Sequence, residues 1–546
     1  MNNPTLIPDA GRRYFPLLVL ALAGINIALF FLLALPYRLF PSDDQLYLQG
    51  LQAPAGEILA TLSQWQNPVY WLCLLGCSKI WALFSTRLLD SLIVTSLAAN
   101  TATILALCHI TLRLTGHRGW ALLAGLLFMT SAWTNTYYFF FSYTPIPTAL
   151  MAVAFACMLT GIHQPLTATA GAQAWPTASG AVLGLALWSA PSATVLTAIL
   201  LPMIVLCHRP KGLLRGLSLF GWQMAGFIAT AAPFARLSFQ AFGNHVVGNI
   251  YTDHYDSAMD KFSYVPQPPA FTFLRIIAEY SPLQTLLAML VFLMLCLALV
   301  SRRHTVGPAQ PASSASPLHG PLAISLILAA ICLAHAVIID LLPTTKLGRA
   351  HFHVTPFLTL FLVVAPCHLL SRLASEKAKG VWRQAYCGLL ILAMAMSAMK
   401  SLTTRAVRFS LPGYLASSPA LQHLYLLRED PHANYIGLWL DDQRLTTVPA
   451  SAISAIINGE SARGAKGALL VGPNGPGSGN SILEQSTMAD FNLPLPPAQM
   501  EGAAHFPYYS FYPPFLFEEE ICQSLYAAGQ TPAHNNPGST IKVLTW

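Results

Sequence analysis

Two adjacent carboxylates, Asp43 and Asp44, directly follow the first long apolar run of the sequence, residues 14–35. This position corresponds to the lipid–water boundary at the end of a membrane helix, where a charge is costly unless it serves a purpose. A carboxylate at a partly dry boundary, beside a second carboxylate, can act as a general base. The pair can also hold a divalent cation through its oxygen atoms. An ordinary polar helix end is the third interpretation.

A second charged segment, residues 346–353, lies at another predicted membrane boundary and carries the opposite charge. Its basic side chains are those of Lys346, Arg349, His351 and His353. Arg and Lys donors at fixed positions stabilise a phosphate leaving group as negative charge develops on it. The alternative is that these side chains only extend to the lipid headgroups as snorkelling cations.

The composition is that of a polytopic α-helical membrane protein. Of the 546 residues, 54% are hydrophobic and only 9% are charged, whereas soluble chains carry about 25% charged residues. The net charge of +7 does not indicate nucleic-acid binding, because basic residues at cytoplasmic helix ends produce the same excess. No CxxC pair occurs among the ten cysteines, so neither a disulfide framework nor a metal pair is predicted.

About eleven apolar segments can cross a bilayer, and we interpret the first as a retained helix rather than a signal peptide. These segments are residues 14–35, 88–112, 119–141, 146–162, 179–191, 192–208, 214–236, 283–300, 321–340, 352–370 and 385–399. A further apolar stretch, residues 66–84, is broken by Pro68 and Gly76 and is either an interfacial helix or an extra span. Residues 163–178 and 301–318 are predicted polar connections.

The basic residues predict the orientation. With a cytoplasmic N-terminus, every cytoplasmic loop is basic, as the positive-inside rule requires. These loops contain Arg12 and Arg13, Arg113 and Arg118, Arg209 to Arg215, Arg302 and Arg303, and Arg372 to Arg383. Asp43, Asp44, Lys346 and Arg349 then all fall on the outer side. We therefore expect a multi-pass protein of the inner (plasma) membrane whose two charged segments face the periplasm.

The composition changes near residue 404. This change predicts a transmembrane domain of residues 1–403 and a small C-terminal α/β extracytoplasmic (periplasmic) domain of residues 404–546. In the C-terminal domain, the patterns predict strands at residues 434–440, 467–471 and 540–546, and helices at 418–427, 450–458 and 515–528. The glycine-rich run at 472–477 lacks the lysine of a P-loop and is predicted to be a turn-rich loop.

The predicted outer loop of residues 237–282 contains Asp253, His254 and Asp256, which can contact an acceptor or ligate a metal ion. A solvated polar loop is the simpler interpretation. Tyr70 is a further candidate acceptor contact, although an aromatic belt at the membrane boundary also accounts for it. Three histidines in or beside apolar helices are predicted to be packed polar contacts: His109, His335 and His368.

Five features occur in an order that is similar to that of a known superfamily. They are the acidic pair Asp43-Asp44, the aromatic stretch Asn67-Pro68-Val69-Tyr70-Trp71, Arg87-Leu88 at the start of the next helix, the basic glycine-containing turn Leu112 to Arg118 before a small-residue helix, and Arg349 ahead of Pro356 in a late helix. The chain resembles the protein O-mannosyltransferase and aminoarabinose transferase branch of the GT-C superfamily, which uses polyprenyl-phosphate sugars. Ser142 to Pro147 and Trp188 to Pro191 depart from that pattern, where family members often carry an acid and a lysine.

The resemblance implies an inverting hexosyl or pentosyl transferase that acts at the outer face of the inner membrane. It would move a sugar from a polyprenyl-phosphate donor to a lipid, glycan or protein acceptor. Asp43 would be the base and Asp44 its orienting or metal-contacting neighbour, with a divalent metal ion as an optional cofactor. Lys346, Arg349, His351 and His353 would bind the donor phosphate.

Two other function classes fit a polytopic chain. A transporter predicts paired repeats and broken or ionisable helices near the bilayer midplane, and no convincing repeat is present. A non-catalytic scaffold for envelope polysaccharide assembly predicts no concentration of acids and bases on one side of the helices. The observed concentration favours the transferase.

Overall fold

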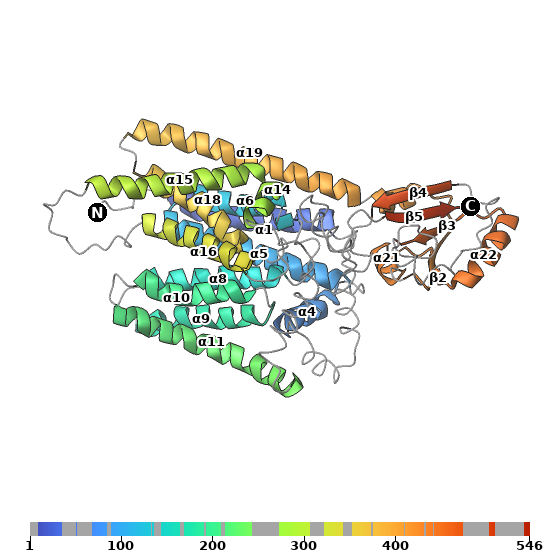
Figure 1. The fold of residues 1–546 in the computed structure, drawn as a ribbon, viewed down its shortest axis with the longest axis horizontal. Helices are drawn as coiled ribbons and strands as arrows, with labels where there is room; N and C mark the ends of the chain where they lie inside the picture. The colour runs from blue at the N-terminus through green and yellow to red at the C-terminus, as the bar shows by residue number, and fades with distance from the viewer. Residues whose placement is uncertain are drawn as a thin grey trace. The chain divides into compact units, whose positions relative to one another are not determined.

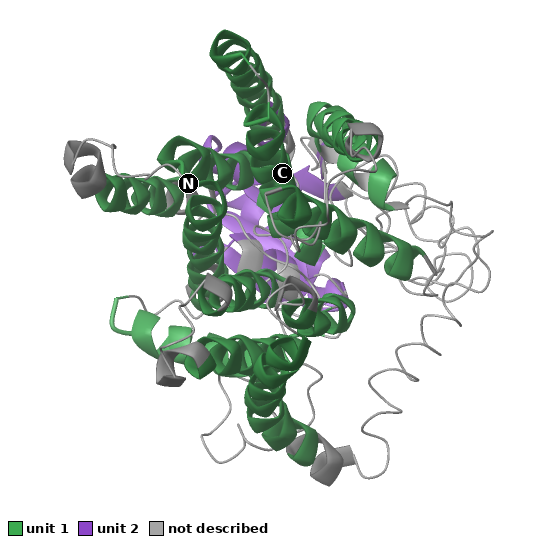
Figure 2. Cartoon of the chain, turned by 90° about the vertical axis from the view of Figure 1, so that its left-hand side faces the viewer, with its two compact units in different colours: residues 1–34, 50–258, 268–398 green, residues 35–49, 259–267, 399–546 purple. Residues whose placement is uncertain are grey.

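The computed structural model describes residues 9–34, 51, 68–84, 89–132, 134–135, 144–163, 169–190, 193–208, 213–242, 272–305, 321–341, 352–372, 375–408, 410–430, 433–440, 442–472, 502–507 and 540–546. These residues divide into two compact units, which Figure 2 colours separately. Among the described residues, unit 1 ends at Ala398 and unit 2 begins at Met399.

Unit 1 is helical. Its elements are α1 (Asp9–Ala34), α4 (Pro68–Trp81), α5 (Leu89–Thr115), α6 (Arg118–Thr130), α8 (Pro145–His163), α9 (Thr169–Leu187), α10 (Ala193–His208), α11 (Leu213–Phe242), α14 (Thr272–Tyr280), α15 (Pro282–Thr305), α16 (Pro321–Leu341), the 3₁₀ turn η4 (Phe352–Val354), α18 (Thr355–Leu370) and most of α19 (Glu376–Arg408). Each of the predicted apolar segments overlaps one of these helices.

Five of the described helices are long and apolar enough to cross a membrane. Their apolar portions are Val94–Thr115, Pro282–Val300, Leu322–Asp340, Phe352–Leu370 and Glu376–Leu402. Shorter apolar helices occur at Phe15–Leu29, Arg118–Thr130, Pro145–Gly161 and Ala193–Val205. A mostly helical fold with several candidate spans is therefore confirmed, whereas the count of eleven spans stays a prediction.

Three helices extend beyond the apolar segments that were predicted for them. The predicted connections at residues 163–178 and 301–318 were therefore too long, and the apolar segment at 385–399 was too short. Helix α9 begins at Thr169, inside the predicted connection 163–178, because its alanine-rich start is a strong helix former. Helix α15 continues to Thr305, and α19 continues to Arg408. Backbone hydrogen bonds propagate a helix regardless of hydropathy, so an apolar window underestimates helix length.

Helix α18 is the core of unit 1. Every residue from Thr355 to His368 is buried, and α5, α6, α15 and α16 pack around it (Figure 1). A helix that is apolar on all sides is expected in such a position. By contrast, large apolar side chains are exposed on α15 and α19, for example Leu293 and Ile391. Exposed apolar surface of this extent suits contact with lipid rather than water.

Several buried hydroxyl groups bond within their own helices. Thr95, Thr103 and Thr359 each donate to the backbone carbonyl four residues earlier, at 2.6 to 2.9 Å. In hydrocarbon no water is present to accept these bonds, so an unsatisfied hydroxyl would be costly. Back-bonding of this kind therefore allows polar residues in helices that are otherwise apolar.

Helices α9 and α11 cross at backbone contact. A Cβ atom on Gly180 would overlap the Gln223 carbonyl oxygen, and one on Gly226 would overlap the Thr177 carbonyl oxygen. The Thr230 hydroxyl donates across the crossing to the Ala181 carbonyl oxygen at 2.9 Å. Small residues permit this approach, and the resulting van der Waals contacts hold membrane helices together.

A pair of alanine substitutions on α11 tests this crossing. Gly226→Ala should lower the thermal midpoint of the purified protein by the equivalent of about 1–3 kcal/mol, because the helices must separate to accommodate the methyl group. Gly221→Ala is the matched control, since a Cβ atom there meets nothing within 4 Å. It should leave the midpoint unchanged or raise it, as alanine is the better helix former. Equal midpoints for the two variants would contradict the close crossing.

Unit 2 contains a five-stranded sheet. Its elements after α19 are α20 (Ser410–Ala416), β1 (His423–Leu427), α21 (Ala433–Leu440), β2 (Leu445–Val448), α22 (Ala450–Ala462), β3 (Gly467–Val471), β4 (Gly502–Pro507) and β5 (Thr540–Thr545). The strand order is β2-β1-β3-β5-β4. Strand β1 pairs in parallel with β2 and β3, and β5 pairs antiparallel with β3 and β4.

Both faces of this sheet are covered. On one face, α20 and α21 pack Leu411 and Ile436 against Leu424 and Leu426. On the other face, α22 packs Ile453 and other apolar residues against the remaining strand side chains. Because β1 and β3 are buried on both faces, they are continuous apolar runs rather than alternating ones.

Two of the predicted elements in this unit were wrong. The predicted helix at 418–427 is in fact a turn followed by β1, because a short apolar run such as residues 424–427 has no period that separates a buried strand from a helix. The predicted strand at 434–440 is α21, whose Ala433, Ile436 and Leu440 lie at helical spacing on one covered face. The strand at Gly467–Val471, the helix from Ala450 and the strand from Thr540 are confirmed. The predicted helix at 515–528 lies outside the described residues.

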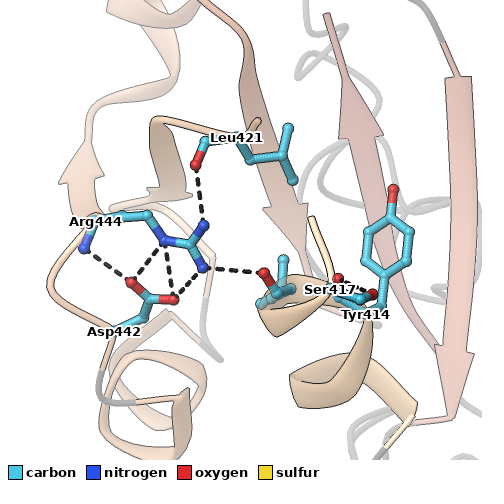
Figure 3. A network of polar contacts seen from close by, with 6 residues as sticks. Tyr414, Ser417, Leu421, Asp442 and Arg444 are labelled. Atoms are coloured by element: carbon cyan, nitrogen blue, oxygen red, sulfur yellow. Dashed lines mark hydrogen bonds and ion pairs between the residues drawn. The ribbon is translucent and has the colours of Figure 1, made fainter. Parts of the chain in front are cut away.

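Arg444 connects three parts of unit 2. Its guanidinium donates to the Asp442 carboxylate at 2.6 Å and to the carbonyl oxygens of Leu421 and Leu415 at 3.0 and 3.2 Å (Figure 3). The planar guanidinium can make all of these bonds at once, which a lysine cannot. The loop before β2 is thereby held against the end of α20 and the turn before β1.

This ion pair makes unit 2 sensitive to acid. The hydrogen bond from Arg444 holds the pKa of the Asp442 carboxyl group below its usual range. The stabilisation is therefore fully present above the pKa of the unfolded chain and is lost as the pH falls through the lower pKa of the folded state.

Asp442→Asn should remove this dependence. At pH 7 the variant should lose about 1 kcal/mol of stability, since both side chains are partly exposed. As the pH falls from about 4 through the lower pKa of the folded state, its difference from the wild type should shrink, because the wild-type carboxylate becomes protonated. Limited proteolysis between residues 410 and 472 across this pH range would measure the effect. Glu376→Gln, which removes an exposed ion pair with Lys379, is the control and should change nothing.

Candidate functional site

The predicted site residues divide into two groups. Two of them are described, Tyr70 on α4 and His353 in η4. The others lie outside the described residues, namely Asp43, Asp44, Asp253, His254, Asp256, Lys346, Arg349 and His351. The placement of their side chains as a site therefore stays a prediction.

His353 occupies the buried turn at which the chain enters α18. Residues Phe352, His353 and Val354 are each 0% exposed. The Nδ1 atom of His353 lies 2.9 Å from the hydroxyl of Thr148, in the first turns of α8. The Thr355 hydroxyl donates to the Phe352 carbonyl oxygen at 2.8 Å and closes the turn. His353 is thus a packed component of the helix bundle rather than a side chain in the headgroup layer.

A second buried histidine, His335, lies on α16, which also packs against η4. Ionisable side chains inside a membrane bundle are costly and usually functional. The sequence interpretation of His335 as a packed polar contact agrees with its complete burial. Both imidazoles lie on elements that meet where α18 begins.

Tyr70 is buried as well. Helix α4 spans 14 residues, or about 21 Å at 1.5 Å per residue, which is shorter than the bilayer core of about 30 Å. This length favours the interfacial helix over the extra span. Tyr70 is 0% and Trp71 1% exposed, so the aromatic-belt interpretation of Tyr70 does not hold, because a belt residue faces lipid.

Helix α4 is attached to the turn between α9 and α10. The Val69 N–H donates to the Trp188 carbonyl oxygen at 3.1 Å. The Trp188 ring packs with Val69 and Ala231, and its centroid is 6.4 Å from that of Phe234 on α11. Trp188 belongs to the segment that departs from the family pattern, and here it anchors α4.

Three helices begin near these residues: α8 at Pro145, α10 at Ala193 and α18 at Thr355. Helix α8 reaches His353 through Thr148, and both α8 and α10 pack against η4. A helix N-terminus carries a partial positive charge. The local field at this end of the bundle therefore favours an anionic group.

The opposite end of α18 is held by His368. Its Nε2 lies 3.1 Å from the Leu114 carbonyl oxygen on α5, and its Nδ1 lies 3.1 Å from the Ser325 hydroxyl on α16. A carbonyl oxygen only accepts, so Nε2 donates to Leu114 and Nδ1 accepts from Ser325. The prediction that His368 is a packed polar contact is confirmed. In the same region Gly116 has φ +70° and ends α5, as a glycine just past a helix end should.

Sequence reasoning missed Thr148 and the role of Trp188. A threonine in an apolar helix most often bonds only to its own backbone, so nothing in the sequence distinguishes Thr148 from its neighbours. Within the described ranges, no group of three or more His, Cys, Asp or Glu side chains is arranged to hold a metal ion. Metal ligation by Asp43 and Asp44 stays a prediction.

Trp188→Ala should detach α4 from the bundle. The buried indole leaves a cavity, and the expected loss of stability is about 3 kcal/mol or more. Limited proteolysis followed by mass spectrometry should then show new cleavage within residues 68–84. Trp222→Ala, on the exposed face of α11, is the control and should behave as the wild type. Unchanged proteolysis of the Trp188 variant would show that α4 is held by other contacts.

Similarity to known proteins is found in the fold and not in the sequence. No family model matches this sequence, and no curated protein sequence is detectably similar to it. The structure is similar to that of ArnT from Cupriavidus metallidurans bound to undecaprenyl phosphate, with a TM-score of 0.50 and 15% identity, over 84% of this chain and 93% of the other.

Two further structures have lower scores. They are AglB from Archaeoglobus fulgidus in complex with an inhibitory peptide and a dolichol-phosphate (TM-score 0.47, 11% identity, 85% of this chain and 70% of the other) and the arabinofuranosyltransferase AftD from Mycobacteria (TM-score 0.44, 14% identity, 84% and 35%). Only the ArnT structure reaches a TM-score of 0.50, since the scores of the other two fall below it. ArnT is a GT-C glycosyltransferase. The predicted resemblance is confirmed at the level of the fold alone, since this protein shares the fold of ArnT.

Proposed function

We propose that this protein is a membrane glycosyltransferase that moves a sugar from a polyprenyl-phosphate donor to a lipid, glycan or protein acceptor. The observation that carries this proposal is the shared fold with ArnT, whose structure contains undecaprenyl phosphate and is matched over 93% of its chain. The candidate residues then supply the two groups that the reaction requires, a base for the acceptor and cations for the donor phosphate.

The reaction is a single displacement. The Asp43 carboxylate takes the proton of the acceptor hydroxyl as its oxygen forms a bond to the anomeric carbon. The bond between that carbon and the phosphate oxygen breaks, and the electron pair leaves with the polyprenyl phosphate. Attack from the face opposite the leaving group inverts the anomeric carbon. Asp44 orients Asp43 or contacts a divalent metal ion.

The leaving phosphate gains negative charge and has to be stabilised. Lys346, Arg349 and His351 provide the cationic groups, and His353 is the point at which their segment joins α18. The N-termini of α8, α10 and α18 support this assignment, because their partial positive charges favour an anion at the same end of the bundle. Tyr70, Asp253, His254 and Asp256 are proposed acceptor contacts.

The sidedness follows from the basic loops. Helix α19 carries the basic residues Lys377, Lys379 and Arg383 in its first turns and includes an apolar stretch long enough for one crossing. We therefore assign the N-terminus to the cytoplasm and residues 404–546, as a C-terminal domain, to the periplasmic side of an inner membrane. The two charged segments then share the outer compartment.

Replacing the base tests the proposal. The purified protein should transfer label from at least one member of a panel of radiolabelled polyprenyl-phosphate sugars to acceptors in a membrane extract. Asp43→Asn should reduce this transfer by about 10²- to 10⁴-fold, which is the usual contribution of a general base. Asp9→Asn, predicted to lie on the cytoplasmic side, should not change it.

Other outcomes assign the chemistry differently. Full activity of Asp43→Asn together with inactive Asp44→Asn would move the base to Asp44. Loss of transfer with a chelator and recovery with added Mg²⁺ or Mn²⁺ would assign the pair to a metal site. Absence of transfer from every donor would overturn the proposed function and favour a transporter or a scaffold.

A further inference from the structure

Helix α19 contacts the rest of unit 1 along one narrow face. The covered side chains lie in a single stripe, at intervals of four, three and four residues: Tyr386, Leu390, Ala393 and Ser397. Of the apolar stretch Glu376–Leu402 only 17% is buried, compared with 83% of the stretch Phe352–Leu370. Apolar packing therefore fixes α19 far less firmly than it fixes α18.

The first polar contact of this face compensates for a missing donor in the core helix α18. In an α-helix each carbonyl oxygen accepts from the N–H four residues later. For Leu362 that residue is Pro366, which lies inside α18 and has no N–H. The hydroxyl of Tyr386 donates to the Leu362 carbonyl oxygen at 2.7 Å. Helix α19 thus supplies the donor that the proline lacks.

The second polar contact compensates for an interruption at the end of α6. Ser131 is extended there, with ψ 126°, so the Ala132 N–H falls outside the hydrogen-bond pattern of α6. The Oγ atom of Ser397 accepts from this N–H at 2.7 Å. The same Oγ atom lies 2.9 Å from that of Ser281, at the junction of α14 and α15. One serine thus connects α19 to two interruptions in the helix bundle.

These two contacts lie at positions that can fix a rigid helix. Tyr386 and Ser397 are 11 residues apart, which is about 16 Å along the helix axis and only about 20° around it. A backbone group without a partner is costly where water is excluded, so each contact favours one position of α19. Together they define its depth and its rotation. Unit 2 begins at Met399, two residues after the second contact.

We propose that α19 is a separable helix, docked on the core of unit 1 by two polar latches. The first latch is the bond from Tyr386 to Leu362, and the second is formed by Ser397 with Ala132 and Ser281. The core stays folded without them, because α5, α6, α15 and α16 already pack around α18. Opening of both latches releases α19 to move relative to that core. This inference is independent of the proposed function.

A double-mutant cycle on the purified protein tests the first latch. Tyr386→Phe removes the hydroxyl but keeps the ring, whose centroid is 6.3 Å from that of Trp120. It should lower the thermal midpoint by about 1–4 °C. In a Pro366→Ala background the backbone N–H is restored, so the same substitution should cost about half as much or less. In a Pro233→Ala background, which changes a proline of α11, the full cost should remain. Equal costs in all three backgrounds would overturn the first latch.

Distance measurements test the release of α19. Spin-labelled non-canonical amino acids at Leu293 on α15 and Ile391 on α19, which are both exposed, report on docking. Labels at Leu293 and at Leu333 on α16, which is also exposed, report on the core. In the variant Tyr386→Phe/Ser397→Ala, the first distance distribution should broaden, whereas the second should match that of the wild type.

The distance measurement decides the inference even if Pro366→Ala does not fold. An unchanged distribution between α15 and α19 would show that other contacts hold α19, and it would overturn the inference. Broadening of both distributions, or failure of the double variant to fold, would overturn it as well, because α19 would then be an integral part of the core.

Discussion

A polar group in an apolar surrounding has to find its hydrogen-bond partner inside the protein, and the arrangement of unit 1 follows from this constraint. Most buried threonines meet it locally, by donating to the carbonyl one turn earlier. His353 in η4, directly before α18, and His368 in α18 do not meet it locally. They bond to other helices instead, His353 to α8 and His368 to α5 and α16. The core helix is thus held at both ends by imidazoles.

The same surroundings explain why the outer helices pack as they do. Between helices in lipid, apolar side chains gain little from association, because the lipid tails are equally apolar. Close backbone contact is the alternative, and α9 and α11 achieve it through Gly180, Gly184 and Gly226. Unit 2 follows the rules of a protein in water. Its sheet is covered by apolar side chains on both faces, and its charged residues pair at the rim.

These packing constraints affect the proposed chemistry at one end of unit 1. The turn at η4, the start of α8 and the attachment of α4 all lie in buried, well-packed surroundings, whereas the reacting carboxylates and cations are predicted in the adjoining loops. A rigid scaffold that carries reactive loops is the usual arrangement for a catalytic site. The proposed glycosyl transfer requires this combination, because the proposed donor is lipid-bound and the proposed acceptor comes from the outer side.

Much of this protein could be predicted from its sequence. Hydropathy located the helices, since each apolar segment overlaps one, and the chain order of the charged and aromatic motifs indicated the GT-C fold. A glycine after α5 marked the turn at Gly116. Site residues such as Asp43 and Arg349 were proposed from their chemistry and their place at helix ends. These features are local, so a single stretch of chain is enough to reveal them.

Other features were decided only by the tertiary structure. The strand at residues 423–427 and the helix at 433–440 depend on which faces the rest of unit 2 covers, because a short apolar run has no period of its own. Helix α4 is bonded to Trp188 through the Val69 N–H, and His353 contacts Thr148, which is 205 positions away. Such pairings arise when particular helix faces pack together, and the sequence alone does not reveal which faces these are.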